Sequence, residues 1–196
     1  MVKIGFKIAP RAVEICHYFL KKVVIQGDKV VDATAGNGYD TLLLAKLVGD
    51  SGKVYSFDIQ EKAIEETRRR LNELGLLHRV ELICSDHENL KKYVKQPIKA
   101  IVFNLGYLPG GNKEIVTRGD STLKALEDSL DMLFPGGVIC LVVYWGHEGG
   151  PEEKEMIESF ISQLSPLQWD VINISFSNKI KAPVVIAVQK RSGEDY

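Results

Sequence analysis

The sequence lacks long apolar runs and has almost no net charge. No stretch approaches the ~18 consecutive apolar residues of a membrane-spanning helix. Charged side chains interrupt the N-terminal segment where the apolar core of a signal peptide would lie. The formal net charge of -1 does not indicate binding of nucleic acid over the whole surface, although a local basic face is compatible with it. We therefore expect a soluble, cytoplasmic protein without a membrane partner.

Cysteine is also scarce. Cys16, Cys84 and Cys140 lie far apart, fit no metal-ligand spacing and cannot all pair with one another. This pattern predicts reduced thiols and no metal site. Cys84 and Cys140 lie in apolar runs, which predict buried strands for both.

What the sequence contains is an alternation of short apolar runs with longer amphipathic stretches. This alternation over 196 residues predicts one domain, residues 1–196, built from parallel βα units. Strands are predicted at residues 29–36, 53–59, 80–86, 99–106 and 138–145. Helices are predicted at 11–25, 39–47, 61–74, 90–94 and 151–164, with a further helix ending before Pro135.

The last two apolar runs, 170–178 and 182–190, leave no room for a helix between them and predict an antiparallel hairpin. The expected fold is α/β, with a mostly parallel seven-stranded sheet, a C-terminal antiparallel hairpin and helices on both faces. In such open sheets, ligands bind at the carboxyl ends of the strands. Polar residues recur there: Asp32, Asp58, Asp86 and Asn104.

A glycine-containing loop follows the first predicted strand, from Asp32 to Gly38. Glycines allow a tight turn, and the helix that follows presents free backbone N–H groups to a ligand. The third glycine of the dinucleotide motif G-x-G-x-x-G is missing. Asp40, in the first turn of the helix, would repel a pyrophosphate but suits the cationic methionine end of S-adenosylmethionine.

The next strand end supplies a carboxylate for a nucleoside. Asp58 follows the loop by about 20 residues, where a carboxylate accepts hydrogen bonds from ribose hydroxyls. Ile59 can lie against adenine, and Gln60 adds a polar contact. Asp86 can accept a hydrogen bond from the adenine amino group. Structural alternatives remain for three residues, because Asp32 can brace the loop, Thr41 can pack the helix start and His87 can cap a helix.

These motifs together resemble one particular family. The strings VVDATAGNGYDTLLLA, FDIQ, SDHENL, FNLGYLPGGNK and VVYWGHEGG are similar to small bacterial S-adenosylmethionine-dependent methyltransferases long labelled putative rRNA methylases. Characterised members of that family N-methylate the 5-aminomethyl group of wobble uridine 34 in tRNA. The resemblance implies a Rossmann-like class I methyltransferase fold, S-adenosyl-L-methionine as cofactor, the tRNA anticodon loop as partner, and compatibility with a homodimer.

The predicted cofactor contacts combine the loop, the strand ends and this resemblance. They are Asp32, Thr34, Ala35, Gly36, Asn37, Gly38, Asp40, Thr41, Asp58, Ile59, Gln60, Ser85, Asp86, His87 and Asn104.

The predicted catalytic residues are Asn104, Tyr107 and His147. The stretch Asn104-Leu105-Gly106-Tyr107 is similar to the N-P-P-Y motif of amine methyltransferases, with Leu105 and Gly106 in place of the prolines. That similarity implies that Asn104 orients the target nitrogen and that Tyr107 contacts the base. His147 is a candidate proton acceptor, with Asp32 and solvent as alternatives, and it can equally hold its glycine-rich loop.

Other functions also remain open at this point. Methylation of rRNA or of a small molecule uses the same cofactor site. An NAD-dependent oxidoreductase fits Asp58, although the missing glycine and Asp40 argue against it. A cofactor-binding protein without catalysis would not need the Asn104 region. Arg118 and the pair Lys179 and Lys181 are among the candidates for contacting phosphate.

Overall fold

The structure is a computed structural model that describes residues 10–95, 97–106 and 116–193. Its strands are β1 (Lys29–Asp32), β2 (Lys53–Asp58), β3 (Val80–Cys84), β4 (Ile98–Leu105), β5 (Leu133–Val143), β6 (Trp169–Ile174) and β7 (Val184–Lys190). Its α-helices are α1 (Ala12–Val23), α2 (Tyr39–Val48), α3 (Glu61–Glu73), α4 (Leu90–Tyr93), α5 (Gly119–Met132) and α6 (Gly150–Ser162). Two short 3-10 helices, η1 (Leu77–Arg79) and η2 (His87–Asn89), flank β3.

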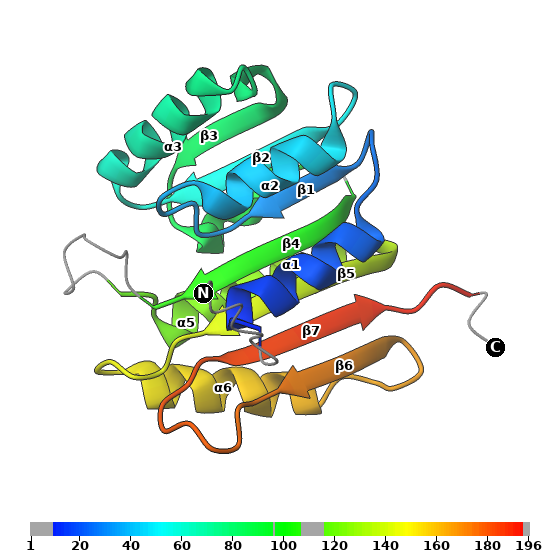
Figure 1. Ribbon diagram of the computed structural model, residues 1–196. Coiled ribbons are helices and arrows are strands. Elements are labelled where there is room, and N and C mark those ends of the chain that lie inside the picture. Colours follow the sequence, from blue (N-terminus) through cyan, green and yellow to red (C-terminus); the bar gives the residue numbers. More distant parts are fainter. Residues whose placement is uncertain (1–9, 96, 107–115, 194–196) are drawn as a thin grey trace, which may run out of the picture.

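All seven strands form one sheet in the order β3-β2-β1-β4-β5-β7-β6 (Figure 1). The first five strands are parallel, whereas β7 pairs antiparallel with both β5 and β6. The order reverses direction at β1, so β1 and β4 lie side by side although β2 and β3 separate them in the chain. The predicted fold, including the terminal hairpin, is confirmed.

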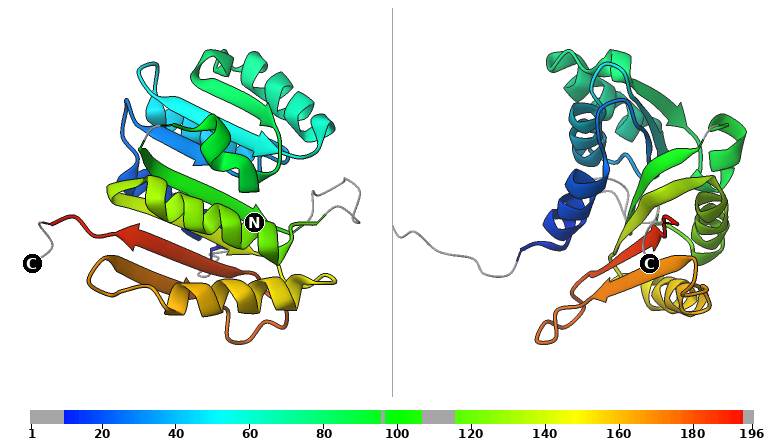
Figure 2. Two further views of the ribbon diagram at one scale, coloured as in Figure 1. Left: turned by 180° about the vertical axis from the view of Figure 1, so that it is seen from behind. Right: turned by 90° about the vertical axis from the view of Figure 1, so that its right-hand side faces the viewer.

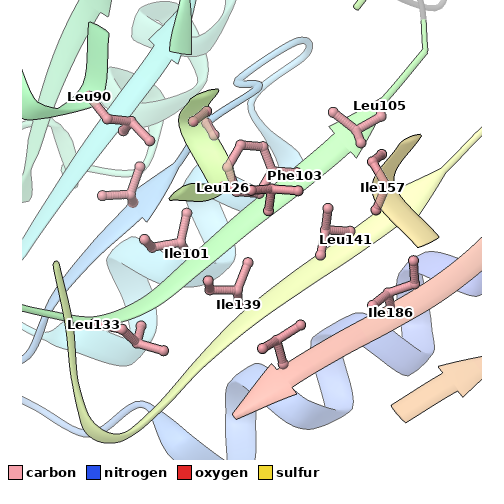
Figure 3. Packing of buried hydrophobic residues seen from close by; sticks show 14 of the residues in the cluster. Leu90, Ile101, Phe103, Leu105, Leu126, Leu133, Ile139, Leu141, Ile157 and Ile186 are labelled. Carbon is pink, nitrogen blue, oxygen red and sulfur yellow. The ribbon is translucent and has the colours of Figure 1, made fainter. Parts of the chain in front are cut away.

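Helices cover both faces of the sheet because buried side chains alternate along its central strands. On β4, Ala100 and Val102 face α1 and α2, whereas Ile101, Phe103 and Leu105 face α5 and α6. Figure 2 shows α5 and α6 on the face opposite α1, and Figure 3 shows the side chains packed beneath them. Such two-sided burial explains why these strands read as nearly continuous apolar runs.

Several predictions from the apolar runs need correction. The first strand ends at Asp32 rather than at residue 36, and β6 ends at Ile174 rather than at residue 178. Cys84 is exposed, whereas Cys140 is buried. The reason is that β3 is an edge strand: on the face shared by Val80, Leu82 and Cys84, burial decreases towards the carboxyl end, so the last side chain is left uncovered. The fifth strand begins at Leu133 rather than at residue 138, because buried Leu133 already pairs with Ile98 before the register shifts.

None of the helices in the described ranges is long and apolar enough to cross a membrane. The same part of the chain contains no cluster of three or more His, Cys, Asp or Glu side chains arranged to hold a metal ion.

Candidate active site

The candidate site lies where the parallel strands end. In Figure 1 the arrowheads of β1, β2, β3 and β4 point to the same edge of the sheet. Asp32 and Asp58 are the last residues of β1 and β2, and Asn104 is the penultimate residue of β4. Ser85 and Asp86 follow β3 directly. The structure therefore gathers at one edge the polar residues that were predicted to lie at strand ends.

The glycine loop is tied to the neighbouring strands by its backbone. Ala35 N–H donates to the Phe57 carbonyl (2.7 Å), and Gly38 N–H donates to the Ala35 carbonyl (2.7 Å). Gly38 has a φ of +80°, and a Cβ there would come within 2.8 Å of Thr67 Oγ1. Glycine is therefore required at this position by both conformation and space. Asn37, between the two glycines, is half-buried.

Asp32 lies beneath this loop and is completely buried. Its carboxylate accepts hydrogen bonds from Thr34 N–H (3.1 Å) and Thr41 Oγ1 (2.5 Å), and Thr41 Oγ1 also lies 2.7 Å from Ser56 Oγ. Burial, together with the nearby Asp40 carboxylate, raises the pKa of Asp32 to about 7. These contacts agree with the bracing role for Asp32 and with a packing role for Thr41.

The raised pKa of Asp32 predicts a pH-dependent stability. In the unfolded chain, Asp32 has its ordinary pKa near 3.8. Between pH 3.8 and about 7, the folded protein therefore holds a proton on Asp32 that the unfolded chain has lost. The contribution of Asp32 to stability therefore falls as pH rises from about 4 through 7. We expect Asp32→Asn to melt at a higher temperature than the wild type at pH 8.5, with a smaller difference at pH 5 and convergence only near pH 4. An unchanged difference across this range, measured by thermal unfolding, would contradict the assignment.

Asp58 retains room to bind a ligand. Its two oxygens accept hydrogen bonds from Gly36 N–H (2.8 Å) and Gln60 N–H (2.9 Å). These bonds join the glycine loop to the start of α3. A carboxylate offers about four acceptor positions, so two backbone bonds leave capacity for ribose hydroxyls. Beside it, 49% of Ile59 is exposed, an apolar surface suited to adenine. Acceptor capacity and apolar surface at one strand end fit an adenosine group.

The residues after β3 differ in burial: Ser85 and Asp86 are partly exposed, whereas His87 is buried. Asp86 accepts Glu88 N–H (2.9 Å) and caps η2, while Ser85 N–H donates to the Asp58 carbonyl (3.0 Å). His87 is buried with its ring edge-on to Phe103. Burial lowers the pKa of His87, which favours its neutral form. Asp86, rather than His87, is therefore the residue that caps η2.

Asn104 is joined once to the glycine loop and once to α2. Its backbone N–H donates to Thr34 Oγ1 (2.7 Å), and its side-chain Nδ2 donates to the Asp40 carboxylate. The second Asp40 oxygen bonds to His17 Nε2 on α1. Asn104 Oδ1 is buried and has no hydrogen-bond partner among the described residues. The amide therefore presents an unused acceptor beside the loop that is predicted to hold the cofactor.

The β5–α6 loop forms the opposite wall. Tyr144 N–H donates to the Leu105 carbonyl (2.9 Å), and Tyr144 is 40% exposed. Burial, and secondarily the Asp40 charge, raises the pKa of Tyr144. His147 Nδ1 lies 2.9 Å from the Glu148 carbonyl, and its Nε2 lies 3.8 Å from where a Cβ on Gly106 would stand. Tyr144 and His147 thus lie beside the end of β4, which carries Asn104.

A buried carboxylate braces this wall. Glu153 on α6 is 2% exposed and accepts hydrogen bonds from Thr117 Oγ1 (2.8 Å) and Thr122 Oγ1 (2.7 Å). Thr117 Oγ1 in turn accepts Gly106 N–H (3.0 Å), and Thr117 N–H donates to the Gly106 carbonyl (3.0 Å). The end of β4 is therefore anchored to both α5 and α6.

Sequence reasoning missed His17, Tyr144 and Glu153 as members of this site. His17 has no motif around it, and Glu153 looks like any acidic residue in the first turn of a helix. Tyr144 stood within the YWGHEGG stretch, so its position after an apolar strand was an available signal. Tyr107, the predicted base contact, lies outside the described residues.

Comparison with known proteins places this site in a family. The family model described as "Putative rRNA methylase" matches residues 54–190, and that of protein-L-isoaspartate(D-aspartate) O-methyltransferase matches residues 3–104. The chain is 42% identical to the Arabidopsis thaliana "tRNA (mnm(5)s(2)U34)-methyltransferase, chloroplastic", covering 92% of this chain and 70% of that protein.

Solved structures agree with these sequence matches. A putative rRNA methylase from Clostridium thermocellum is 41% identical, with a TM-score of 0.91 over 94% of this chain and 100% of that one. A putative methyltransferase from Streptococcus mutans, in complex with SAH, is 36% identical, with a TM-score of 0.85 over 93% and 99% of the two chains. The chain belongs to the "Putative rRNA methylase" family and is an S-adenosylmethionine-dependent methyltransferase.

Proposed function

We propose that this protein transfers a methyl group to the 5-aminomethyl nitrogen of wobble uridine 34 in tRNA. The observation that carries the proposal is Asn104 Oδ1, a buried acceptor without a partner in the described chain, next to the cofactor loop. Such an oxygen can accept a hydrogen bond from an N–H group of an amine. This hydrogen bond orients the lone pair of the amine nitrogen. The activity named for the Arabidopsis relative supports the same acceptor.

The chemistry needs alignment more than acid–base power. When bound, S-adenosylmethionine supplies a methyl group that its sulfonium already activates. Asn104 holds the neutral amine so that its lone pair lies along the methyl–sulfur axis, and alignment of this kind is a large contribution to rate. The nitrogen gains the methyl carbon, the carbon–sulfur bond breaks, and one proton leaves the nitrogen.

His147 is the proposed proton acceptor. The Glu148 carbonyl can only accept, so Nδ1 of His147 donates to it and Nε2 is the basic nitrogen of the neutral ring. Nε2 lies on the Gly106 side, at the end of β4. Asp32 is fully buried beneath the loop, which makes it the weaker alternative. Solvent remains the other acceptor of the proton.

Two aromatic rings are proposed to hold the uracil. Tyr107, three residues after Asn104 in the sequence, keeps its proposed role as a contact of the base. Tyr144 is 40% exposed, and its backbone N–H donates to the Leu105 carbonyl at the end of β4, which places a second aromatic residue there. A base extruded from the anticodon loop can stack on such rings.

The cations of the β6–β7 turn are proposed to bind phosphate. Lys179 and Lys181 are exposed, and Lys181 Cβ lies 3.7 Å from where a Cβ on Gly146 would stand, so this turn adjoins the His147 loop. We expect Lys179→Gln/Lys181→Gln to weaken tRNA binding. The slope of log K against log salt should become shallower by about 0.7 to 0.9 for each phosphate that the variant no longer neutralises. Filter binding at several salt concentrations measures this slope.

The matched control carries the same charge change at the opposite edge of the sheet. Lys46 lies in the last turn of α2, and Lys53 begins β2. The variant Lys46→Gln/Lys53→Gln should keep the wild-type slope. Equal reductions of the slope in both double variants would show that the site has no local basic surface.

The proposed function is tested with purified protein, S-adenosylmethionine and tRNA that carries the aminomethyl precursor. Nucleoside mass spectrometry should show one added methyl group on the precursor and none on tRNA that lacks the aminomethyl group. If parallel reactions methylate rRNA and not the precursor tRNA, the substrate is rRNA and the proposal for tRNA is wrong. Tight NAD binding without S-adenosylmethionine binding would refute a methyltransferase altogether.

We further propose a cytoplasmic location and a homodimer. The three cysteines are free, as expected where thiols stay reduced. The edge strand β6 exposes Val171 (39%) on one face of the sheet and Ile172 (48%) on the other, and a second copy that pairs along this edge would shelter both. Light scattering after size-exclusion chromatography should give twice the chain mass of 21.9 kDa.

A further inference from the structure

An asparagine amide can adopt two orientations that differ little in shape but are opposite in hydrogen bonding. One end donates and the other accepts. If the NH₂ group of Asn104 faced the substrate, it would meet an amine whose lone pair is required for attack. It would then compete for that lone pair instead of accepting an N–H. Methyl transfer therefore depends on which way this amide is turned.

Asp40 provides the means to choose the orientation. It is 7% exposed, on the first turn of α2, and one of its oxygens meets the Asn104 side chain. An ionised carboxylate only accepts hydrogen bonds, so the amide must present Nδ2 to it. The Oδ1 atom is then directed away from Asp40, and this is the buried atom without a partner in the described chain.

His17 completes the arrangement from a third element. It lies on α1 next to buried Cys16, and its Nε2 meets the other Asp40 oxygen. Its side chain is 22% exposed and that of Asp40 is 9% exposed, so this hydrogen bond is mostly sheltered from water. A buried carboxylate needs donors on both oxygens, and a hydrogen bond from His17 fixes the plane in which Asp40 faces Asn104.

We propose that His17 and Asp40 are positioning residues that lock the Asn104 amide with Oδ1 towards the reacting amine. This inference rests on the proposed function and deepens it by assigning a role to two residues outside the N-L-G-Y motif. It also gives Asp40 a role other than contact with the methionine end of the cofactor. The two roles make opposite predictions for cofactor affinity.

The first test separates turnover from cofactor binding. Asp40→Asn removes the acceptor-only partner and allows either amide orientation. We expect kcat on precursor tRNA to fall about 10- to 100-fold, as for other small losses of alignment, with the S-adenosylmethionine Kd within about threefold of wild type. Asp120→Asn, an exposed residue in the first turn of α5, is the matched control and should keep wild-type kcat.

The second test uses rescue at His17. His17→Ala should lower kcat about tenfold, whereas His17→Gln, whose amide can still donate to Asp40, should recover most of it. A role in folding alone would lower the melting temperature of both variants and leave kcat of the folded protein unchanged. His78→Ala, an exposed histidine paired with Asp50, controls for loss of an imidazole.

A third measurement does not depend on the substrate. In ¹⁵N spectra, the Asn104 side-chain NH₂ pair is identified by its absence in Asn104→Ala. Its exchange with water should be about tenfold faster in Asp40→Asn than in the wild type. If wild-type protein fails to methylate the precursor, the proposed function fails, and this exchange rate still decides whether Asp40 holds the amide.

Two results would overturn the inference. One is an unchanged NH₂ exchange rate and kcat in Asp40→Asn. The other is a large rise in the S-adenosylmethionine Kd with kcat retained, which would assign Asp40 to the cofactor instead.

Discussion

Replacement of Asn104 by alanine is expected to lower kcat by about 100-fold or more. The variant removes Asn104 Oδ1, the hydrogen-bond acceptor near the end of β4 that is proposed to face the amine. Misalignment of a reacting group lowers the rate by a factor of this size. Cofactor affinity should change by less than about threefold, because the backbone N–H of residue 104 still donates to Thr34. Single-turnover kinetics with precursor tRNA and calorimetric titration of S-adenosylmethionine measure the two effects separately.

A surface asparagine provides the control for this variant. Asn72 is exposed on α3, and Asn72→Ala should leave both quantities unchanged. If Asn104→Ala retains wild-type turnover, the assignment of Asn104 to the reacting amine is wrong even though the fold and the family remain correct.

The second large effect is expected at Asp58. Asp58→Ala removes the acceptor for the ribose hydroxyls and also leaves Gly36 N–H and Gln60 N–H without their partner. Hydrogen bonds to a charged group contribute about 1.5 to 3 kcal/mol each, so the S-adenosylmethionine Kd should rise by about 100-fold or more. This weakening should appear in cofactor titration before any RNA is added.

Asp50→Ala is the matched control for Asp58→Ala. Asp50 is an exposed carboxylate that contacts His78 and Arg79 after α2. We expect its removal to leave cofactor affinity unchanged, because the loop after α2 lies at the opposite edge of the sheet. A wild-type Kd in Asp58→Ala would place the ribose elsewhere.

Much of the fold could be predicted because its signals are local. Each apolar run was long enough to identify a buried strand, and the parallel arrangement followed from the intervening helices. The errors arose where tertiary position decides the outcome. Cys84 is exposed because β3 lies at the sheet edge, and no run of residues in the sequence reports its place in the sheet.

The candidate site divides in the same way. Asp32, Asp58 and Asn104 could be predicted because strand ends of a parallel sheet meet at one edge. His17 could not, since its contact with Asp40 depends on how α1 packs against the sheet. The role of Glu153 was also hidden, because an acidic residue near a helix start is usually solvent-exposed, whereas two threonines from outside α6 bury this one.

We propose that Asn104 Oδ1 accepts a hydrogen bond from the substrate amine beside the glycine loop. A crystal structure with SAH and an anticodon stem-loop carrying the aminomethyl uridine measures this contact directly. We predict that the aminomethyl nitrogen lies within hydrogen-bond distance of Asn104 Oδ1, about 2.9 Å, with SAH against Asp58. An amine bound elsewhere, or an Asn104 amide turned with its NH₂ group towards the substrate, would contradict this claim.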